Sequence, residues 1–185
     1  MNRLLVLAVA LLPFVYGQEK QVSIDPAATE IHWILPGNVH TVHGTFKLKR
    51  GQLRFNPETG AASGELVADA TSGESGSKDR DSKMHSSVIE SQKYSEIVFM
   101  PDKVIGAVNL AGESTVQIHG RFRIHGTEQE ATLPATTHIE GTRIKATLHF
   151  PIPYVQWKMK NPSNFLFRVN PAVDIEIQAV GTIAP

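Results

Sequence analysis

The chain has 185 residues, with 18 basic and 18 acidic side chains and no cysteine. Balanced charge without a basic run argues against nucleic-acid binding, which needs a basic stripe to neutralise phosphates. Without cysteine there is no disulfide, thiol catalysis or thiolate metal site, so packing and sheet hydrogen bonds must stabilise the fold.

The first seventeen residues have the pattern of a signal peptide. Arg3 precedes an apolar run over residues 4–12, which ends at Pro13, and small Gly17 precedes the expected cut at Gln18. The run is too short for a hydrocarbon core of ~30 Å, which takes ~20 apolar residues. No cysteine follows that could carry a lipoprotein anchor. The pattern therefore predicts a periplasmic or secreted protein with one mature domain over residues 18–185.

Period-two alternation of apolar and polar residues dominates the mature chain and is typical of half-buried strands. It predicts strands around residues 31–35, 42–48, 53–55, 66–70, 116–124, 142–150 and 173–179. Turn-forming residues at 35–38, 56–60, 101–102 and 140–141 separate these runs. Many short strands with one apolar face each are typical of a closed barrel or a sandwich. Strand glycines at 44, 51, 64 and 120 indicate bends or bulges, which favour the barrel.

One segment departs from this alternation. Met84, Val88 and Ile89 follow a helical spacing, and Asp81 or Ser82 could cap the first turn. We therefore predict one short helix over about residues 81–93, packed on or beside an all-β, antiparallel, eight-stranded barrel.

The order of several short motifs resembles the YceI-like family of exported lipid- and polyisoprenoid-binding proteins. Its first two strands are similar to Ile24-Asp25-Pro26 with Ile31-His32-Trp33, and to residues 39–46 (VHTVHGTF). Further similar motifs lie at residues 78–84 (KDRDSKM), 96–99 (EIVF), 116–120 (VQIHG) and 124–130 (IHGTEQE). The resemblance runs from about Val22 to Ile183. It implies a lipocalin-like barrel with an elongated apolar tunnel.

Two segments differ from the family pattern. Residues 88–91 (VIES) stand where an aromatic pair is usual, and residues 154–162 (YVQWKMKNP) stand where many members carry a final "R.DFG" motif. Both are expected near the pore or its mouth. The resemblance therefore does not carry over the identity of the lipid.

The inward positions of the predicted strands combine small and large residues. Small ones leave room for one slender ligand, since an eight-stranded barrel is just wide enough for that. They are Gly44, Ala68, Ala70, Gly120 and Ala146, while the large candidates for a ligand-binding wall are Trp33, Phe46, Leu48, Phe122 and Leu148. The same residues would equally make an ordinary filled core.

Aromatic residues near the C-terminus are candidates to close one end of the tunnel: Tyr154, Trp157, Phe165 and Phe167. Tyr154 and Trp157 would share a side in a helical turn but not in a strand, and the sequence leaves both open. Tyr154 and Trp157 are included among the expected ligand-binding residues, and plain core packing or a surface brace is the alternative.

Histidines are the remaining candidates for chemistry. His40 and His43 are expected near the barrel mouth, where they could hydrogen-bond a lipid head group. A strand would point them to opposite faces, and His119 with His125 lacks a third ligand tied by spacing, so no metal site is predicted. Asp79, Arg80 and Asp81 are expected to form ion pairs and a cap at the helix start, with a polar gate as the alternative.

No nucleophile elbow, catalytic triad or phosphate loop stands out, so neither an enzyme nor a cofactor is predicted. The leading hypothesis is a carrier or sequestering protein for a polyisoprenoid, quinone or fatty-acyl lipid. Transient membrane contact and a monomer or homodimer are compatible with it. The alternative is a filled-core module acting in envelope stress or partner binding through its surface.

Overall fold

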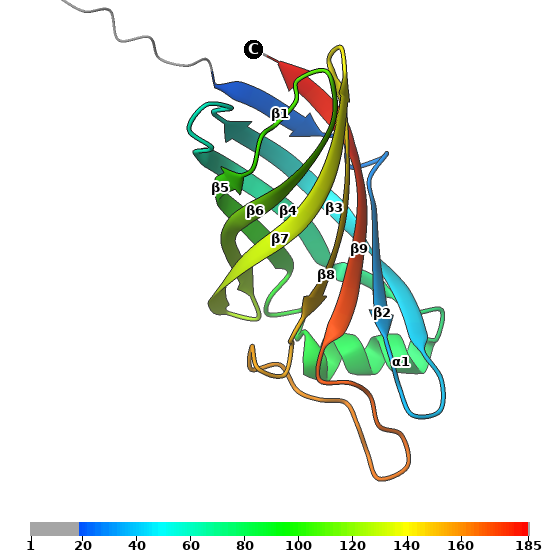
Figure 1. Cartoon of the computed structure of the whole chain (residues 1–185). Coiled ribbons are helices and arrows are strands. Elements are labelled where there is room, and N and C mark those ends of the chain that lie inside the picture. The colour runs from blue at the N-terminus through cyan, green and yellow to red at the C-terminus, as the bar shows by residue number, and fades with distance from the viewer. Residues whose placement is uncertain (1–18, 185) are drawn as a thin grey trace, which may run out of the picture.

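Long stretches of alternating residues form an antiparallel barrel in the computed structural model, which describes residues 19–184 (Figure 1). The predicted signal peptide, 1–17, lies outside the described residues. The nine strands are β1 (Lys20–Ile24), β2 (Glu30–Leu35), β3 (Val42–Phe55), β4 (Ala62–Glu74), β5 (Glu96–Ile105), β6 (Gly112–Ile124), β7 (Thr127–Glu140), β8 (Arg143–Ile152) and β9 (Val173–Ala184). Along β6 and β8, buried or half-buried positions on one face alternate with mostly exposed positions on the other, as their sequence alternation predicts.

These nine strands occupy eight positions around the barrel. β1 and β2 both pair with β3 on one side and with β9 on the other, so they follow one another in a single position of the wall. The remaining neighbours run β9–β8–β7–β6–β5–β4, and the β3–β4 pairing closes the ring. The prediction of an all-β, antiparallel, eight-stranded barrel with one short helix is confirmed.

Two predicted boundaries in the sheet are wrong because bulges lie inside the strands. Residues 53–55 were expected to be a separate strand, but β3 is continuous and carries a register shift between Leu48 and Arg50. Pro101 and Asp102 were expected to form a turn, but they lie within β5, where its register against β6 shifts between Pro101 and Lys103. A bulge inserts one extra residue and exchanges which positions face inward, so it breaks simple alternation.

The helix begins and ends earlier than predicted. It consists of α1 (Lys78–Lys83) and a π-helical turn η1 (Met84–Val88), rather than residues 81–93. Ser77 occupies the N-cap position of α1, but its side chain makes no capping hydrogen bond. Asp81 is not the cap, because its carboxylate accepts hydrogen bonds from the Ser75 backbone N–H (2.8 Å) and hydroxyl (2.6 Å). Among residues 19–184, no helix is long and apolar enough to cross a membrane.

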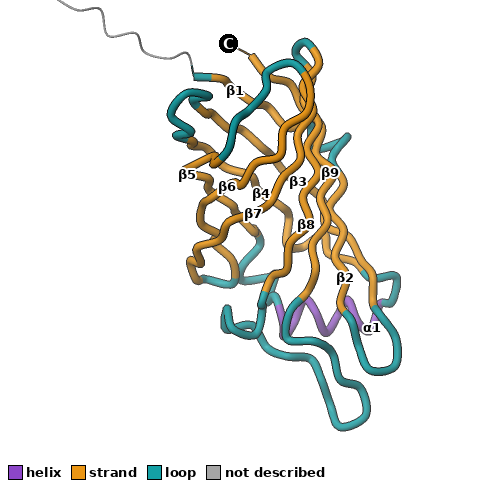
Figure 2. Tube along the Cα trace, viewed as in Figure 1, coloured by secondary structure: helices purple, strands orange, loops and turns teal. Residues whose placement is uncertain are grey.

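The two ends of the barrel differ. At one end lie α1, the β2–β3 loop over residues 36–41 and the long β8–β9 loop over residues 153–172 (Figures 1 and 2). At the other end an apolar group, here called the closed-end cluster, packs between the strands: Val22, Phe55, Ile139, Ile144 and Ile183. The barrel is therefore sealed at one end, while loops and the helix surround the other.

Candidate functional site

An apolar cavity of about 580 Å³ occupies the interior of the barrel. Inward side chains of β2–β9 line it, and it extends from residues packed against the closed-end cluster, such as Ile24 and Leu53, to the helix end. Exposed Val39, His40 and Phe167 also line it, so it opens to solvent between the loops and α1. Its volume falls within the ~300–1,000 Å³ usual for small-molecule sites.

Most of the residues predicted to bind a ligand lie in this wall. They are Trp33, His40, Phe46, Leu48, Phe122, Ala146, Leu148 and Tyr154. They come from β2, β3, β6 and β8, together with the two long loops. Of the predicted small residues, Ala68 and Ala146 line the cavity, whereas Gly44, Ala70 and Gly120 are not part of its lining.

Two predicted residues do not line the cavity. His43 is exposed on β3, because its buried neighbour Val42 takes the inward position of the pleat. It is therefore not in a position to contact a head group from the wall. Trp157 is buried behind the wall and packs on Phe122, with ring centroids 5.6 Å apart. It supports a lining residue rather than contacting the cavity.

Tyr154 and Trp157 lie on one helical turn, which settles the alternative left open by the sequence. The Trp157 N–H donates to the Pro153 carbonyl (3.1 Å), and the Met159 N–H donates to the Tyr154 carbonyl (3.0 Å). The Tyr154 hydroxyl donates to the Asn170 carbonyl (2.8 Å), and its burial raises its pKa to about 12. This bond fixes the two arms of the long loop together. Phe165, by contrast, is exposed and closes nothing.

Several lining residues were not among the predicted site residues. The helix contributes Arg80, Lys83, Met84 and Val88. The loops contribute Asn164 and Arg168, and β9 contributes Val173, Ile175, Ile177 and Ala179. Phe167, one of the candidates to close the tunnel, also lines the cavity. The alternation of β9 marked its inward face in the sequence, but no local pattern indicated that the charged residues would meet at the mouth.

Polar groups are confined almost entirely to this mouth. Apart from Trp33 and Thr29, every polar lining residue belongs to the loops or the helix: Asn38, His40, Tyr154, Asn164, Arg168, Arg80 and Lys83. Within the described chain, the indole N–H of Trp33 is buried without a hydrogen-bond partner. An unsatisfied buried donor costs ~1–3 kcal/mol. The nitrogen has no accessible surface toward the cavity, so Trp33 contributes only other parts of its ring to the lining.

Comparison with known proteins agrees with this geometry. The model of the YceI-like domain family matches residues 23–181. The chain belongs to the YceI-like family. No curated protein matches the sequence.

Solved structures share the fold at low sequence identity. Burkholderia cenocepacia BcnA is 17% identical, with a TM-score of 0.71, covering 88% of this chain and 99% of that one. A polyisoprenoid binding domain from Saccharophagus degradans is 16% identical, with a TM-score of 0.65 and coverages of 89% and 98%. Campylobacter jejuni YCEI protein is 13% identical, with a TM-score of 0.51 and coverages of 97% and 98%.

Three other histidines of this YceI-like chain make local contacts. His119 pairs with Asp102, the extra residue of the β5 bulge (2.6 Å), and His125 pairs with Glu90 beyond the helix. His85 lies between the Ser91 hydroxyl (2.9 Å) and the Gly73 carbonyl (2.8 Å). Over residues 19–184, no three potential ligands come together to hold a metal ion.

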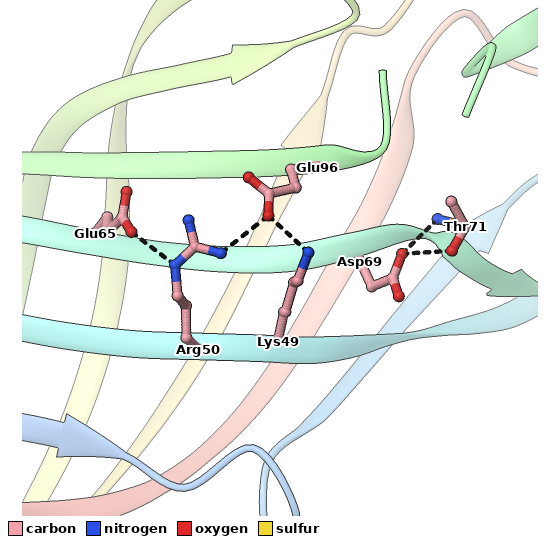
Figure 3. Close-up of polar contacts among 6 residues, drawn as sticks. All are labelled: Lys49, Arg50, Glu65, Asp69, Thr71 and Glu96. Carbon is pink, nitrogen blue, oxygen red and sulfur yellow. Dashed lines mark hydrogen bonds and ion pairs between the residues drawn. The ribbon is translucent and has the colours of Figure 1, made fainter. Parts of the chain in front are cut away.

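An ion-pair cluster crosses the outer face of three strands (Figure 3). The bulge in β3 leaves Lys49 without a partner residue in the β3–β4 ladder, beside Arg50. The side-chain nitrogens of Lys49 and Arg50 both contact the Glu96 carboxylate of β5, at 2.8 and 2.9 Å. Arg50 also contacts Glu65 of β4 at 2.8 Å. Arg50 and Lys49 lower the pKa of Glu96 to about 2. The bulge thus places two cations where they connect β3 with β4 and β5.

This lowered pKa predicts how acid affects stability. The ordinary pKa is 4.5, so the contribution of Glu96 is complete above about pH 5 and is lost as the pH falls toward 2. We expect Glu96→Gln to reduce the fall in the free energy of unfolding between pH 5 and pH 2, measured by urea titration. Glu113→Gln on β6 controls for the loss of one acidic side chain. Equal slopes in the two variants would contradict a role for the cluster.

Proposed function

We propose that the chain binds one long apolar lipid in the barrel interior and serves as a periplasmic carrier or sequestering protein. The observation that carries this proposal is the apolar cavity of about 580 Å³, sealed at one end and open at the other. A polyisoprenoid, quinone or fatty-acyl chain has the slender shape that an eight-stranded barrel can accommodate. The Saccharophagus degradans relative is a polyisoprenoid binding domain, which supports the same ligand class.

The energetics favour a tail held by the wall alone. Each methylene moved from water to an apolar wall contributes ~0.8 kcal/mol, so ten contribute ~8 kcal/mol before the cost of ordering the chain. His40 and the cationic residues line the mouth, which supports contact between them and a polar head group.

The proposed role is binding rather than catalysis. The wall is apolar, and the lining residues of the mouth include no acid that could pair with His40 as a general base system. A filled-core interaction module would need a solid interior, and the cavity favours the lipid-binding proposal over it.

Native mass spectrometry of the mature protein, followed by organic extraction, tests the proposal. We expect a stoichiometric mass excess that extracts as an isoprenoid, quinone or fatty-acyl compound. An unchanged apo mass after incubation with each of these lipids would contradict lipid binding. It would instead favour function through the outer surface.

A further inference from the structure

Two loops join into one projection beside the mouth of the cavity, here called the tip: residues 36–41 and 161–170. They lie side by side below the barrel (Figure 1). Asn38 holds them together, because its backbone N–H donates to the Arg168 carbonyl (2.9 Å) and its side-chain carbonyl accepts from the Arg168 N–H (2.9 Å). The Asn170 N–H also donates to the Pro36 carbonyl (2.9 Å). The tip is therefore an organised structure.

The backbone of the tip turns its largest apolar side chains outward. Asn164 shapes this turn by accepting hydrogen bonds from the backbone N–H groups of Leu166 (2.9 Å) and Phe167 (2.8 Å). Phe165 is 89% exposed, Leu166 67%, Val39 63% and Phe167 53%. The other large apolar residues exposed in the described chain, Ile105 (46%) and Leu110 (40%), lie at the opposite end of the barrel. A concentrated exposed apolar group indicates an interaction surface.

The loops that form the tip carry basic residues and no acid, in a chain with equal numbers of acids and bases. Residues 153–172 include Lys158, Lys160 and Arg168 but no acid, and residues 36–41 include His40 but no acid. The neighbouring helix places Arg80 and Lys83 in the cavity lining, and Lys83 donates to the Pro162 carbonyl (2.7 Å). Of the nearby helix acids, Asp81 is held by Ser75, while Asp79 is exposed and absent from the lining.

We propose that the tip docks on an anionic phospholipid membrane, with Phe165, Leu166, Phe167 and Val39 entering the interface. Apolar side chains flanked by cations match a membrane surface, where phosphates lie just outside the acyl region. The mouth opens beside the tip, so a lipid could pass between bilayer and cavity with little exposure to water. That last consequence rests on the proposed function. A symmetric second copy would place like charges against each other, which disfavours it.

Vesicle co-sedimentation tests the docking. We expect the mature protein to bind vesicles of equal parts phosphatidylcholine and phosphatidylglycerol, and to bind phosphatidylcholine alone more weakly. Salt of about 1 M should weaken binding, because it shortens the Debye length to ~3 Å. The double variant Phe165→Ser/Leu166→Ser should lower the partition coefficient about tenfold or more, since two large apolar side chains no longer enter the interface. Ile105→Ser/Leu110→Ser at the opposite end should leave it unchanged.

Two results would overturn the proposal: no binding of the mature protein to mixed vesicles, or equal losses in both double variants. A dimer of the mature protein that the tip variant alone dissociates, without vesicle binding, would also overturn it and assign the surface to a second copy. Binding of a fluorescent fatty acid in solution, measured on the same proteins, separates this proposal from the lipid-binding function. If the mature protein binds vesicles but not the fatty acid, the lipid-binding function is refuted and the docking stands. If it binds the fatty acid but not vesicles, the docking is refuted and the function stands.

Discussion

Ala146→Phe is expected to lower the affinity for a long-tailed lipid about tenfold or more while the barrel stays folded. Ala146 lines the cavity on β8, across from Ala179 on β9. Two residues earlier on the same face, Ile144 belongs to the closed-end cluster. A phenylalanine ring would fill the deep part of the cavity and exclude the end of the tail. Loss of two buried methylenes, at ~0.8 kcal/mol each, already corresponds to about tenfold.

Lipid series of increasing chain length, titrated by fluorescence displacement, measure this effect. Short tails should bind the variant nearly as well as the wild type, because they do not reach the deep end. Thr147→Phe is the matched control, since the neighbouring residue is exposed on the outer face of the same strand. If long tails bind both variants equally well, they do not occupy the cavity beside Ala146.

Gly44→Ala is expected to reduce the free energy of unfolding by about 3 kcal/mol or more, the upper range for overpacking a core. Gly44 lies directly opposite Trp33 in the β2–β3 ladder. An added Cβ would lie 2.2 Å from the Trp33 ring and 2.2 Å from the Glu74 carbonyl oxygen. The carbonyl belongs to the backbone of β4, so it cannot move aside as a flexible side chain would.

Urea unfolding measures this loss, and Gly76→Ala provides the comparison. Gly76 has a φ of +75° with nothing within 4 Å of an added Cβ, so its replacement costs only the left-handed conformation, ~1–2 kcal/mol. Equal losses at the two sites would mean that both the Trp33 ring and the Glu74 backbone shift aside at little cost. In that case Gly44→Ala should alter lipid binding instead, because Trp33 lines the cavity.

The sequence was informative wherever one strand keeps one alternation. β6 and β8 alternate without interruption, and their inward residues were identified correctly because each strand has one face turned away from solvent. The sequence pattern predicted two strands in place of β3, because the apolar positions change from even numbers, ending at Leu48, to odd numbers, beginning at Leu53. The bulge between Leu48 and Arg50 is the physical cause of that change. The change of parity was the available signal.

The candidate site was only partly predictable for a different reason. Residues of the wall follow from strand periodicity, which is local in the sequence. The mouth depends on contacts between segments far apart in the chain, such as Asn38 with Arg168 and Lys83 with Pro162. No spacing rule relates these positions. The outward direction of His43 could be read from the pleat, whereas the place of Trp157 behind Phe122 required the helical turn that begins at Pro153.

The division of one wall position between β1 and β2 has a consequence for local opening of the barrel. These strands have five and six residues, whereas their neighbours β3 and β9 have 14 and 12. Between them, residues 25–29 leave the ladder, and the main bridge is the Asp25 N–H donating to the Val180 carbonyl (2.8 Å). Short strands detach at lower free energy than long ones, so amide hydrogens of β1 and β2 should exchange ahead of those in β6 and β7. Release of β2 alone would widen the barrel sideways next to the mouth, leaving the sealed end intact.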